Sequence, residues 1–363
     1  MKAPTRAVLY GALCVACLSG VARADETEEA AGKGAQTRET PEFEEEMTVT
    51  GTREERAVTD VPSAVAVIDQ EVLRQGRGEG LDSYLNQTPG VVAQSNDGGS
   101  DVKLSIRGFG ARSTFGVRDV LVLVDGVPIT DADGFTRLDQ IDLAAAERLE
   151  VVKGPASALY GNAAFGGVVN VITRHGSLQD SEIRVRGEAG ELGFSKALLS
   201  VGGGSLPHRL AWALSGSRSD LTGFREHNDT ETRRLNGTLD WFLSEATTVR
   251  SLVNLSQMRD EIPGSLNRQQ FEADPDQVRP FFELFDWRRD DDRYRLGALA
   301  ERQLGADASF EGRLFVLTRD LDHPIFQVID QQGLRLMGGA RYGRALGERH
   351  RLLTGVDLDR EEI

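Results

Sequence analysis

The feature that most constrains the fold is an alternation of apolar and polar side chains from residue 182 to the end of the chain. It comes in nine segments of roughly ten residues, the length of a strand that crosses a bilayer. Successive side chains of a strand point to opposite faces, so one face of each segment is apolar and the other polar. Examples on the apolar faces are Ile183, Val185, Trp212, Leu214 and Leu296. The pattern predicts antiparallel strands of a transmembrane β-barrel, with a soluble β-sandwich as the alternative.

The connections between these segments alternate in length. Short connections are expected at 203–207, 244–247, 304–308 and 344–348, and longer ones at 220–230, 261–292 and 321–331. Short turns on one side and long loops on the other are typical of outer-membrane barrels. If the first strand runs outward, the long loops are extracellular.

The first 24 residues are predicted to be a cleaved signal peptide. Lys2 and Arg6 precede an apolar run from Val8 to Val21, and Ala22-Arg23-Ala24 forms a small-residue cleavage site. The run is shorter than the roughly 20 residues that a spanning helix needs. Both cysteines lie inside this segment, so the mature chain holds none and a disulfide scaffold is excluded.

Composition excludes several functions. Lys and Arg number 42 and Asp and Glu 57, a net charge of −15, which argues against nucleic-acid binding. The five histidines are scattered and never at metal-ligand spacing, and we find no nucleophile elbow or phosphate-binding loop. We therefore expect no enzyme, no metal site and no cofactor.

Residues 54–176 are expected to form an α/β domain. Val120 to Val124 is wholly apolar, as in a strand buried on both faces, and the Asp125-Gly126 pair that follows is a strong hairpin signal. Leu81, Tyr84 and Leu85 have helical spacing. Further strands are expected at 65–68, 104–108, 151–153 and 168–172. Short helices are expected at 144–150 and 156–159.

Two short segments precede this domain. Residues 25–43 are charged and small, which predicts a flexible tether. Residues 44–53 follow, and their Thr- and Val-rich centre has high strand propensity. Such a segment can add as a strand to the sheet edge of another protein, although a plain edge strand or linker is an alternative.

In order along the chain, these segments resemble the TonB-dependent outer-membrane receptors. The motifs are the TonB box at 46–51, "PGV" at 89–91, "IRG" at 106–108, "DGVP" at 125–128 and the long run from Ile141 through Gly161 to Thr173. The resemblance implies an N-terminal α/β plug domain followed by antiparallel transmembrane β-barrel strands, an incomplete 22-stranded barrel. It implies no chemistry on the ligand.

The resemblance also implies a mechanism and partners. The plug blocks the barrel, and ligand binds the extracellular loops and the plug apex. TonB, energised through ExbB and ExbD, pairs with the box and pulls on the plug. We therefore expect active import of a scarce small-molecule ligand across the lipid of the bacterial outer membrane. A ferric siderophore is the expected ligand, while vitamin B12, haem, other metals and glycans stay open.

Three sets of site residues are expected. The TonB-binding residues are Glu46, Met47, Thr48, Val49, Thr50 and Gly51. Charges within apolar stretches are expected to tie the plug to the barrel, namely Arg107, Glu147, Arg148 and Glu150. Plug-apex residues expected to contact ligand are Asn96, Arg112, Phe115, Asp131 and Asp133.

An alternative function follows from the strand count. Nine segments are fewer than the 22 strands of such transporters, and an open sheet would leave bare edges in lipid. On this alternative the chain is a truncated remnant that binds but does not transport.

Overall fold

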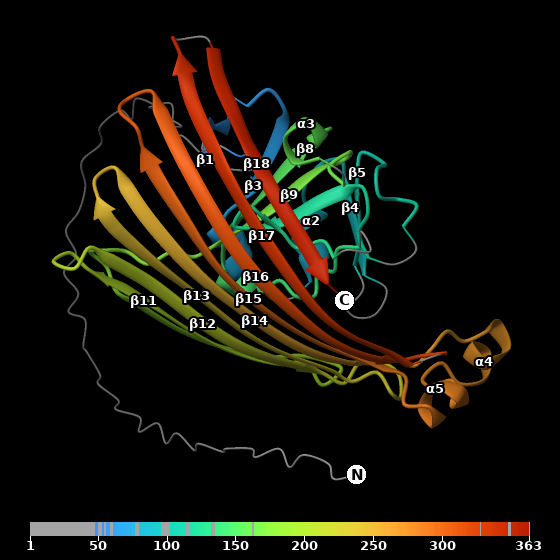
Figure 1. Cartoon of the computed structure of the whole chain (residues 1–363). Coiled ribbons are helices and arrows are strands. Elements are labelled where there is room, and N and C mark those ends of the chain that lie inside the picture. Colours follow the sequence, from blue (N-terminus) through green and yellow to red (C-terminus); the bar gives the residue numbers. More distant parts are fainter. Residues whose placement is uncertain are drawn as a thin grey trace, which may run out of the picture. The chain divides into compact units, whose positions relative to one another are not determined.

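In the computed structural model the nine alternating segments form one antiparallel sheet, called the wall below (Figure 1). The structure describes residues 48–49, 53, 56–58, 61–76, 80–95, 102–113, 116–131, 135–161, 163–326, 328–347 and 350–362. These residues belong to one compact unit, residues 46–363. The predicted signal peptide and tether lie outside the described residues.

The wall is a meander in which each strand pairs with the next along the chain. Its strands are β10 (Glu182–Ala189), β11 (Ser195–Ser205), β12 (Leu210–Leu221), β13 (Thr230–Ser244), β14 (Thr247–Glu261), β15 (Arg288–Gln303), β16 (Ala308–Pro324), β17 (Val328–Leu346) and β18 (His350–Glu362). The predicted count of nine strands and their order are confirmed.

One face of the wall is apolar and exposed, as the alternation predicts. In the pairing register Leu296 of β15 lies opposite Val316 of β16, which lies opposite Leu336 of β17. Ile183 and Val185 on β10 are each 77% exposed. Such a face is suited to lipid rather than to water. None of the helices in the described part of the chain is both long and apolar enough to span a bilayer.

The connections differ from expectation at one place. The predicted long loop at 321–331 is wrong, because β16 and β17 stay paired as far as Pro324 and Val328. The long loop predicted at 261–292 is present but spans only 262–287, because β15 begins at Arg288, and it contains two short helices, α4 (Arg268–Ala273) and α5 (Pro280–Leu284). Asn267 begins α4 with a capping box.

The α/β domain, called the plug below, is built on a mixed five-stranded sheet in the order β3-β8-β9-β6-β7. These strands are β3 (Ala64–Ile68), β6 (Val120–Val124), β7 (Val127–Pro128), β8 (Ala146–Lys153) and β9 (Gly167–Thr173). A separate hairpin joins β4 (Val91–Ser95) to β5 (Val102–Ile106), and the helices are α1 (Gln70–Gln75), α2 (Leu81–Leu85), the 3-10 turn η2 (Leu143–Ala145) and α3 (Ser157–Tyr160).

Most local predictions in the plug are confirmed, and one is wrong. The buried strand β6, the helix α2 and the Asp125-Gly126 turn are present as expected. Asp125 and Gly126 both have positive φ, 50° and 74°, as the tight two-residue turn requires. The helix predicted at 144–150 is instead a 3-10 turn followed by β8, which pairs with β3 and β9 on its two sides.

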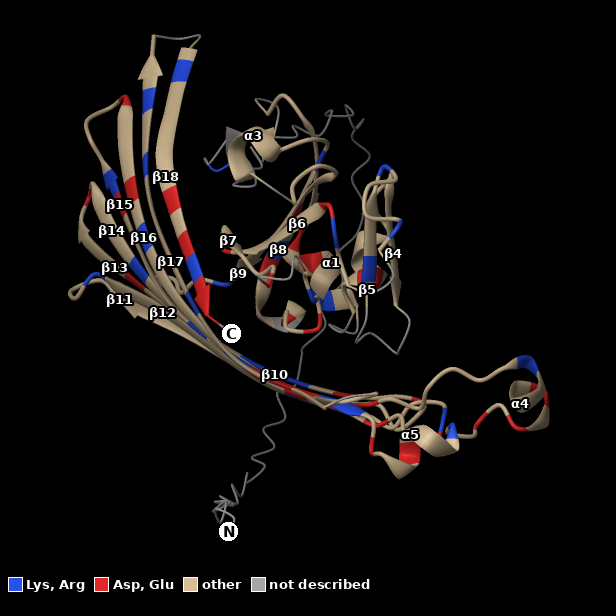
Figure 2. Ribbon diagram, turned by 45° about the vertical axis from the view of Figure 1, so that its right-hand side comes forward, with Lys and Arg blue, Asp and Glu red and all other residues tan. Residues whose placement is uncertain are grey.

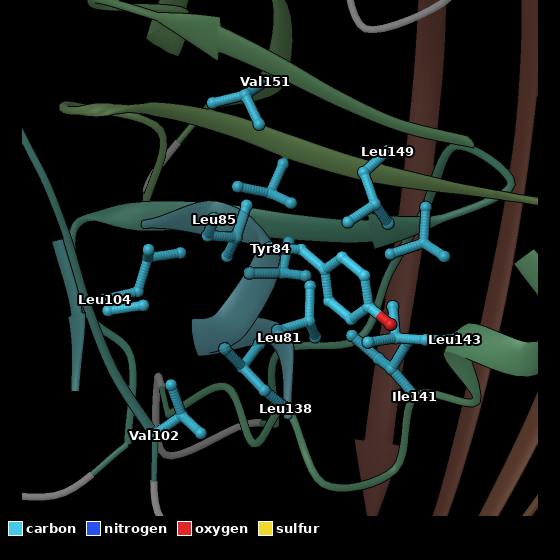
Figure 3. Packing of buried hydrophobic residues seen from close by; sticks show 14 of the residues in the cluster. Leu81, Tyr84, Leu85, Val102, Leu104, Leu138, Ile141, Leu143, Leu149 and Val151 are labelled. Atoms are coloured by element: carbon cyan, nitrogen blue, oxygen red, sulfur yellow. The ribbon is translucent and has the colours of Figure 1, made fainter. Parts of the chain in front are cut away.

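The described residues of the plug form two apolar clusters, and in the larger of them α2 packs against the sheet (Figure 3). Leu85 and Leu149 have no exposed surface, and the ring of Tyr84 lies among Leu81, Leu143 and Leu149. The Tyr84 hydroxyl donates to the carbonyl of Leu73 over 3.1 Å, which satisfies the one polar group of that ring.

We predict that Leu85→Ala lowers the free energy of unfolding of the plug by about 2–5 kcal/mol, since it opens a cavity in a fully buried site. Amide hydrogen exchange of β8 and β9 measures this. Val92→Ala, at a position 53% exposed on β4, is the matched control. Equal exchange in both variants would contradict the packing described.

Candidate functional site at the contact between plug and wall

Strand β15 carries a row of charged side chains toward the inner face of the wall. Arg289, Asp291, Arg293 and Arg295 occupy alternate positions, and three of them, all but Arg293, are buried. The period of two puts all four on one face. Figure 2 shows basic and acidic segments following one another along the wall strands. Burying a charge costs free energy unless the charge is paired. The groups that pair with these four side chains therefore determine what packs against this face.

Asp131 of the plug meets two wall arginines. Its Oδ1 lies 2.7 Å from Nη1 of Arg293, and its Oδ2 lies 2.9 Å from Nη2 of Arg293 and 3.2 Å from Nη1 of Arg319. Both arginines also bind Asp291 of β15, Arg293 through Nε at 2.9 Å and Arg319 through Nη2 at 2.9 Å. Two guanidinium groups and two carboxylates therefore form one balanced, largely buried network.

Asp139 of the plug makes a second tie. Its Oδ2 accepts from Nη2 of Arg289 over 2.6 Å, and both side chains are 7% exposed. Arg234 of β13 donates to the backbone carbonyl of the same residue over 2.7 Å. Burial raises the pKa of Asp139, while the charge of the adjacent Arg137 acts in the opposite direction.

Hydrogen bonds from two uncharged donors to a third plug carboxylate add a third tie. Oδ2 of Asp142 in the plug accepts from Oγ of Ser217 over 2.9 Å and from Nδ2 of Asn236 over 3.1 Å. Nδ1 of His175, just after β9, lies 3.2 Å from Oδ2 of Asp240 on β13. Sequence reasoning missed these three carboxylate ties, because their partners lie 75 to 188 positions away.

The four residues expected to tie plug to wall make the following contacts within the plug. Arg148 donates to Glu147 over 3.0 Å and lies 2.9 Å from Glu150, which is fully buried. Arg107 is exposed, has positive φ and donates its backbone N–H to the carbonyl of Gly90 over 2.8 Å. Their role toward the wall stays a prediction. Arg148 does line a cavity together with Arg250 and Glu301 of the wall.

Of the residues expected to contact ligand, two are described. Arg112 is exposed, as a ligand contact requires. Asp131 is held in the ion pairs with Arg293 and Arg319. Asn96, Phe115 and Asp133 lie outside the described residues. Ligand contact therefore stays a prediction for all five.

Within the expected TonB box, Thr48 and Val49 form β1 (Thr48–Val49), which pairs with β2 (Arg56–Ala57). Glu46, Met47, Thr50 and Gly51 lie outside the described residues. Just after the box, Nη1 of Arg53 lies 2.5 Å from Oδ2 of Asp357, and its guanidinium stacks 4.5 Å from the ring centre of Tyr160. The chain that follows the box is thus fastened to both wall and plug.

The loop between β14 and β15 gathers aromatic side chains that sequence reasoning left unassigned. Trp287 is 4% exposed, packs at a tilt on Phe282 with 3.8 Å between ring centres, and meets Phe326 of the β16–β17 connection edge to face at 4.4 Å. Phe281 and Phe285, paired at 4.5 Å, are about half exposed. The loop is therefore a folded unit with an aromatic surface.

We predict that the Asp131–Arg293 pair is energetically coupled. In a double-mutant cycle of Asp131→Ala and Arg293→Ala, the coupling free energy for plug unfolding should lie in the range of about 0.5–3 kcal/mol. Urea titration followed by amide hydrogen exchange measures it. The exposed pair Arg218–Asp220 is the control and should give less than ~1 kcal/mol. Coupling no larger than in the control would show that Asp131 does not fasten the plug.

Comparison with known proteins agrees with this architecture. Residues 57–168 match the family described as "TonB-dependent Receptor Plug Domain". The "Vitamin B12 transporter BtuB" of Vibrio vulnificus is 32% identical over 191 residues, 51% of this chain and 29% of that protein. The "Iron-regulated outer membrane virulence protein" of Vibrio cholerae is 35% identical over 139 residues, 36% of this chain and 20% of that protein. The chain thus spans less than a third of the length of these curated relatives.

Solved structures resemble the fold over more of the chain. The ferric citrate transporter FecA in its unliganded form gives a TM-score of 0.70 at 24% identity, covering 84% of this chain and 48% of that one. The ferric yersiniabactin uptake receptor FyuA of Yersinia pestis gives 0.67 at 14% identity, covering 82% and 48%. Residues 57–168 therefore belong to the TonB-dependent receptor plug-domain family, and most of the chain shares the fold of these solved structures.

Proposed function

We propose that the protein imports a scarce ligand across the bacterial outer membrane, after export and removal of the signal peptide behind Ala24. The observation that carries the proposal is the fastening of the plug to the wall by Asp131, Asp139 and Asp142. The plug also meets the wall in one small apolar cluster, in which Val127 packs against the wall residues Leu252, Leu299, Phe315 and Met337. A plug held by polar ties and a cluster of this size can move against the wall, because its polar groups can exchange partners with water.

TonB, energised by ExbB and ExbD, is the proposed source of force. The box residues 46–51 lie directly before Arg53, which is fastened to Asp357 and packs on Tyr160. A strand of TonB that pairs with the box would therefore pull on a segment already fixed to plug and wall. The β1–β2 pairing shows that Thr48 and Val49 can take up strand geometry.

A ferric siderophore is the proposed ligand. Several similar structures are titled as receptors or transporters of ferric citrate, ferric enterobactin and ferric yersiniabactin, while one sequence relative is named a vitamin B12 transporter. We propose that Arg112, which is exposed, contacts the anionic ligand together with Asn96, Phe115, Asp131 and Asp133. We also keep Arg107, Glu147, Arg148 and Glu150 as proposed ties to the barrel.

We predict that Val49→Pro abolishes ligand uptake but leaves ligand binding at the cell surface intact. Proline removes the backbone donor and breaks strand pairing with TonB. Iron-starved cells that express the receptor are tested with a panel of radiolabelled ferric siderophores, with and without energy poisoning.

The matched control is Val49→Ile, which keeps strand propensity and should keep uptake. Uptake that survives both Val49→Pro and deletion of Met47 to Thr50 would refute dependence on TonB. Surface binding lost in Val49→Pro would instead indicate misfolding of the plug.

A further inference from the structure

Arg295 on β15 is a buried cation with no hydrogen-bond or ion-pair partner among the residues that the structure describes. It is 7% exposed and belongs to the same inward row as Arg289 and Arg293, both of which bind plug carboxylates. Among the residues that the structure describes, its guanidinium makes no hydrogen bond or ion pair, and its buried Nε has no acceptor. Leaving a charge in this state costs free energy, so the site is suited to an anion that the protein itself does not supply.

The residues around Arg295 explain why no carboxylate pairs with it. Across the wall it lies opposite Asn254 of β14 on one side and Leu317 of β16 on the other. Leu317 has no polar atom to offer. The carboxylate of Asp131 is already held by Arg293 and Arg319. That of Asp125 accepts from the N–H and the hydroxyl of Thr173, at 2.9 and 2.8 Å.

Asn254 itself has an unused acceptor, and its orientation is fixed by a chain of amides. The carboxylate of Asp142 accepts from Asn236, which must therefore turn its Nδ2 toward Asp142. The Oδ1 of Asn236 then accepts from Nδ2 of Asn254 over 3.0 Å. Oδ1 of Asn254 is therefore the last atom of this row of hydrogen-bonded side chains, and it is buried without a donor. An unpaired cation and an unpaired acceptor thus lie on adjacent strands.

Both side chains line one cavity between plug and wall. Its volume is about 110 Å³, while one water needs only ~10–15 Å³ by the same measure. Val124, Ile141 and Leu317 supply apolar surface to the same cavity. The charged groups of its lining are four arginines and three carboxylates, namely Arg293, Arg295, Arg319, Arg335, Asp131, Asp142 and Glu361. One positive charge is therefore in excess, and a small anionic ligand would meet apolar surface on one side and polar groups that fix its orientation on the other.

We propose that this cavity binds a small hydroxycarboxylate, free or as part of a larger ligand. The carboxylate accepts from the guanidinium of Arg295, and a neighbouring hydroxyl donates to Oδ1 of Asn254. A role of this site in transport rests on the proposed import function. Binding of the hydroxycarboxylate does not rest on it, because binding requires neither TonB nor an energised inner membrane.

The test measures binding of L-malate and of succinate, which lacks the hydroxyl, to the purified protein in detergent by titration calorimetry. We expect malate to bind about 3- to 10-fold more tightly than succinate. Arg295→Met should weaken malate binding at least ~10-fold. Asn254→Asp, which places a carboxylate opposite Arg295, should abolish it, because the protein then supplies its own anion.

Thermal unfolding of the same variants gives an independent readout. Arg295→Met and Asn254→Asp should both raise Tm in the absence of ligand, since the first removes the unpaired buried charge and the second gives it a partner on the adjacent strand. Arg302→Met, at an exposed position of the same strand, is the matched control and should change neither Tm nor binding.

Three results would overturn the proposal: the wild-type protein binds neither acid, Arg295→Met leaves malate binding unchanged, or Arg295→Met lowers Tm. Equal affinity for malate, succinate and phosphate would reject the hydroxycarboxylate in favour of a general anion site. Failure of cellular uptake would leave these binding results unaffected, so the two proposals fail separately.

Discussion

The pairing of charges between plug and wall is the interaction on which the rest of this structure depends. A strand of period two that is apolar toward lipid must be polar toward the lumen, so the wall brings arginines such as Arg289 and Arg293 inward. Once a domain covers that face, these charges lose water and need partners. Asp139 and Asp131 supply them. The outward hydrophobicity of the wall and the acidic loops of the plug are therefore linked requirements.

Such pairs give position rather than large net stability. The free-energy cost of removing two charges from water roughly offsets their mutual attraction, whereas removing one partner of a buried pair is strongly destabilising. The plug is therefore held in one place against the wall by these pairs, together with one small apolar cluster around Val127 and Phe315. The large apolar cluster around Leu85 and Leu149 lies within the plug, so the domain can keep its own fold while its contacts to the wall change.

Local patterns predicted the elements, and long-range pairing decided where the predictions failed. The wall strands and the Asp125-Gly126 turn follow from neighbouring residues alone. Residues 144–150 have good helix propensity, but Glu150 and Leu149 lie in a central strand with partners on both sides, so tertiary pairing overrides propensity. Polar residues such as Asp322 and Asp330 indicated a loop, yet they face each other in an extended hairpin.

The candidate site was least accessible to sequence reasoning for the same reason. Charges in apolar stretches drew attention to Arg148 and Glu150, whose recorded partners lie within the plug. The ties to the wall come from Asp131, Asp139 and Asp142 in polar loops, where nothing local distinguishes them from solvated residues.

Arg293 and Arg295 are two positions apart on one face of one strand, and the sequence does not tell them apart. The difference arises only from their surroundings. Arg293 meets a plug carboxylate, whereas Arg295 lies opposite Leu317 and Asn254. A fold that satisfies one arginine and leaves the next without a partner keeps a local cost, and such costs concentrate where a protein binds something else.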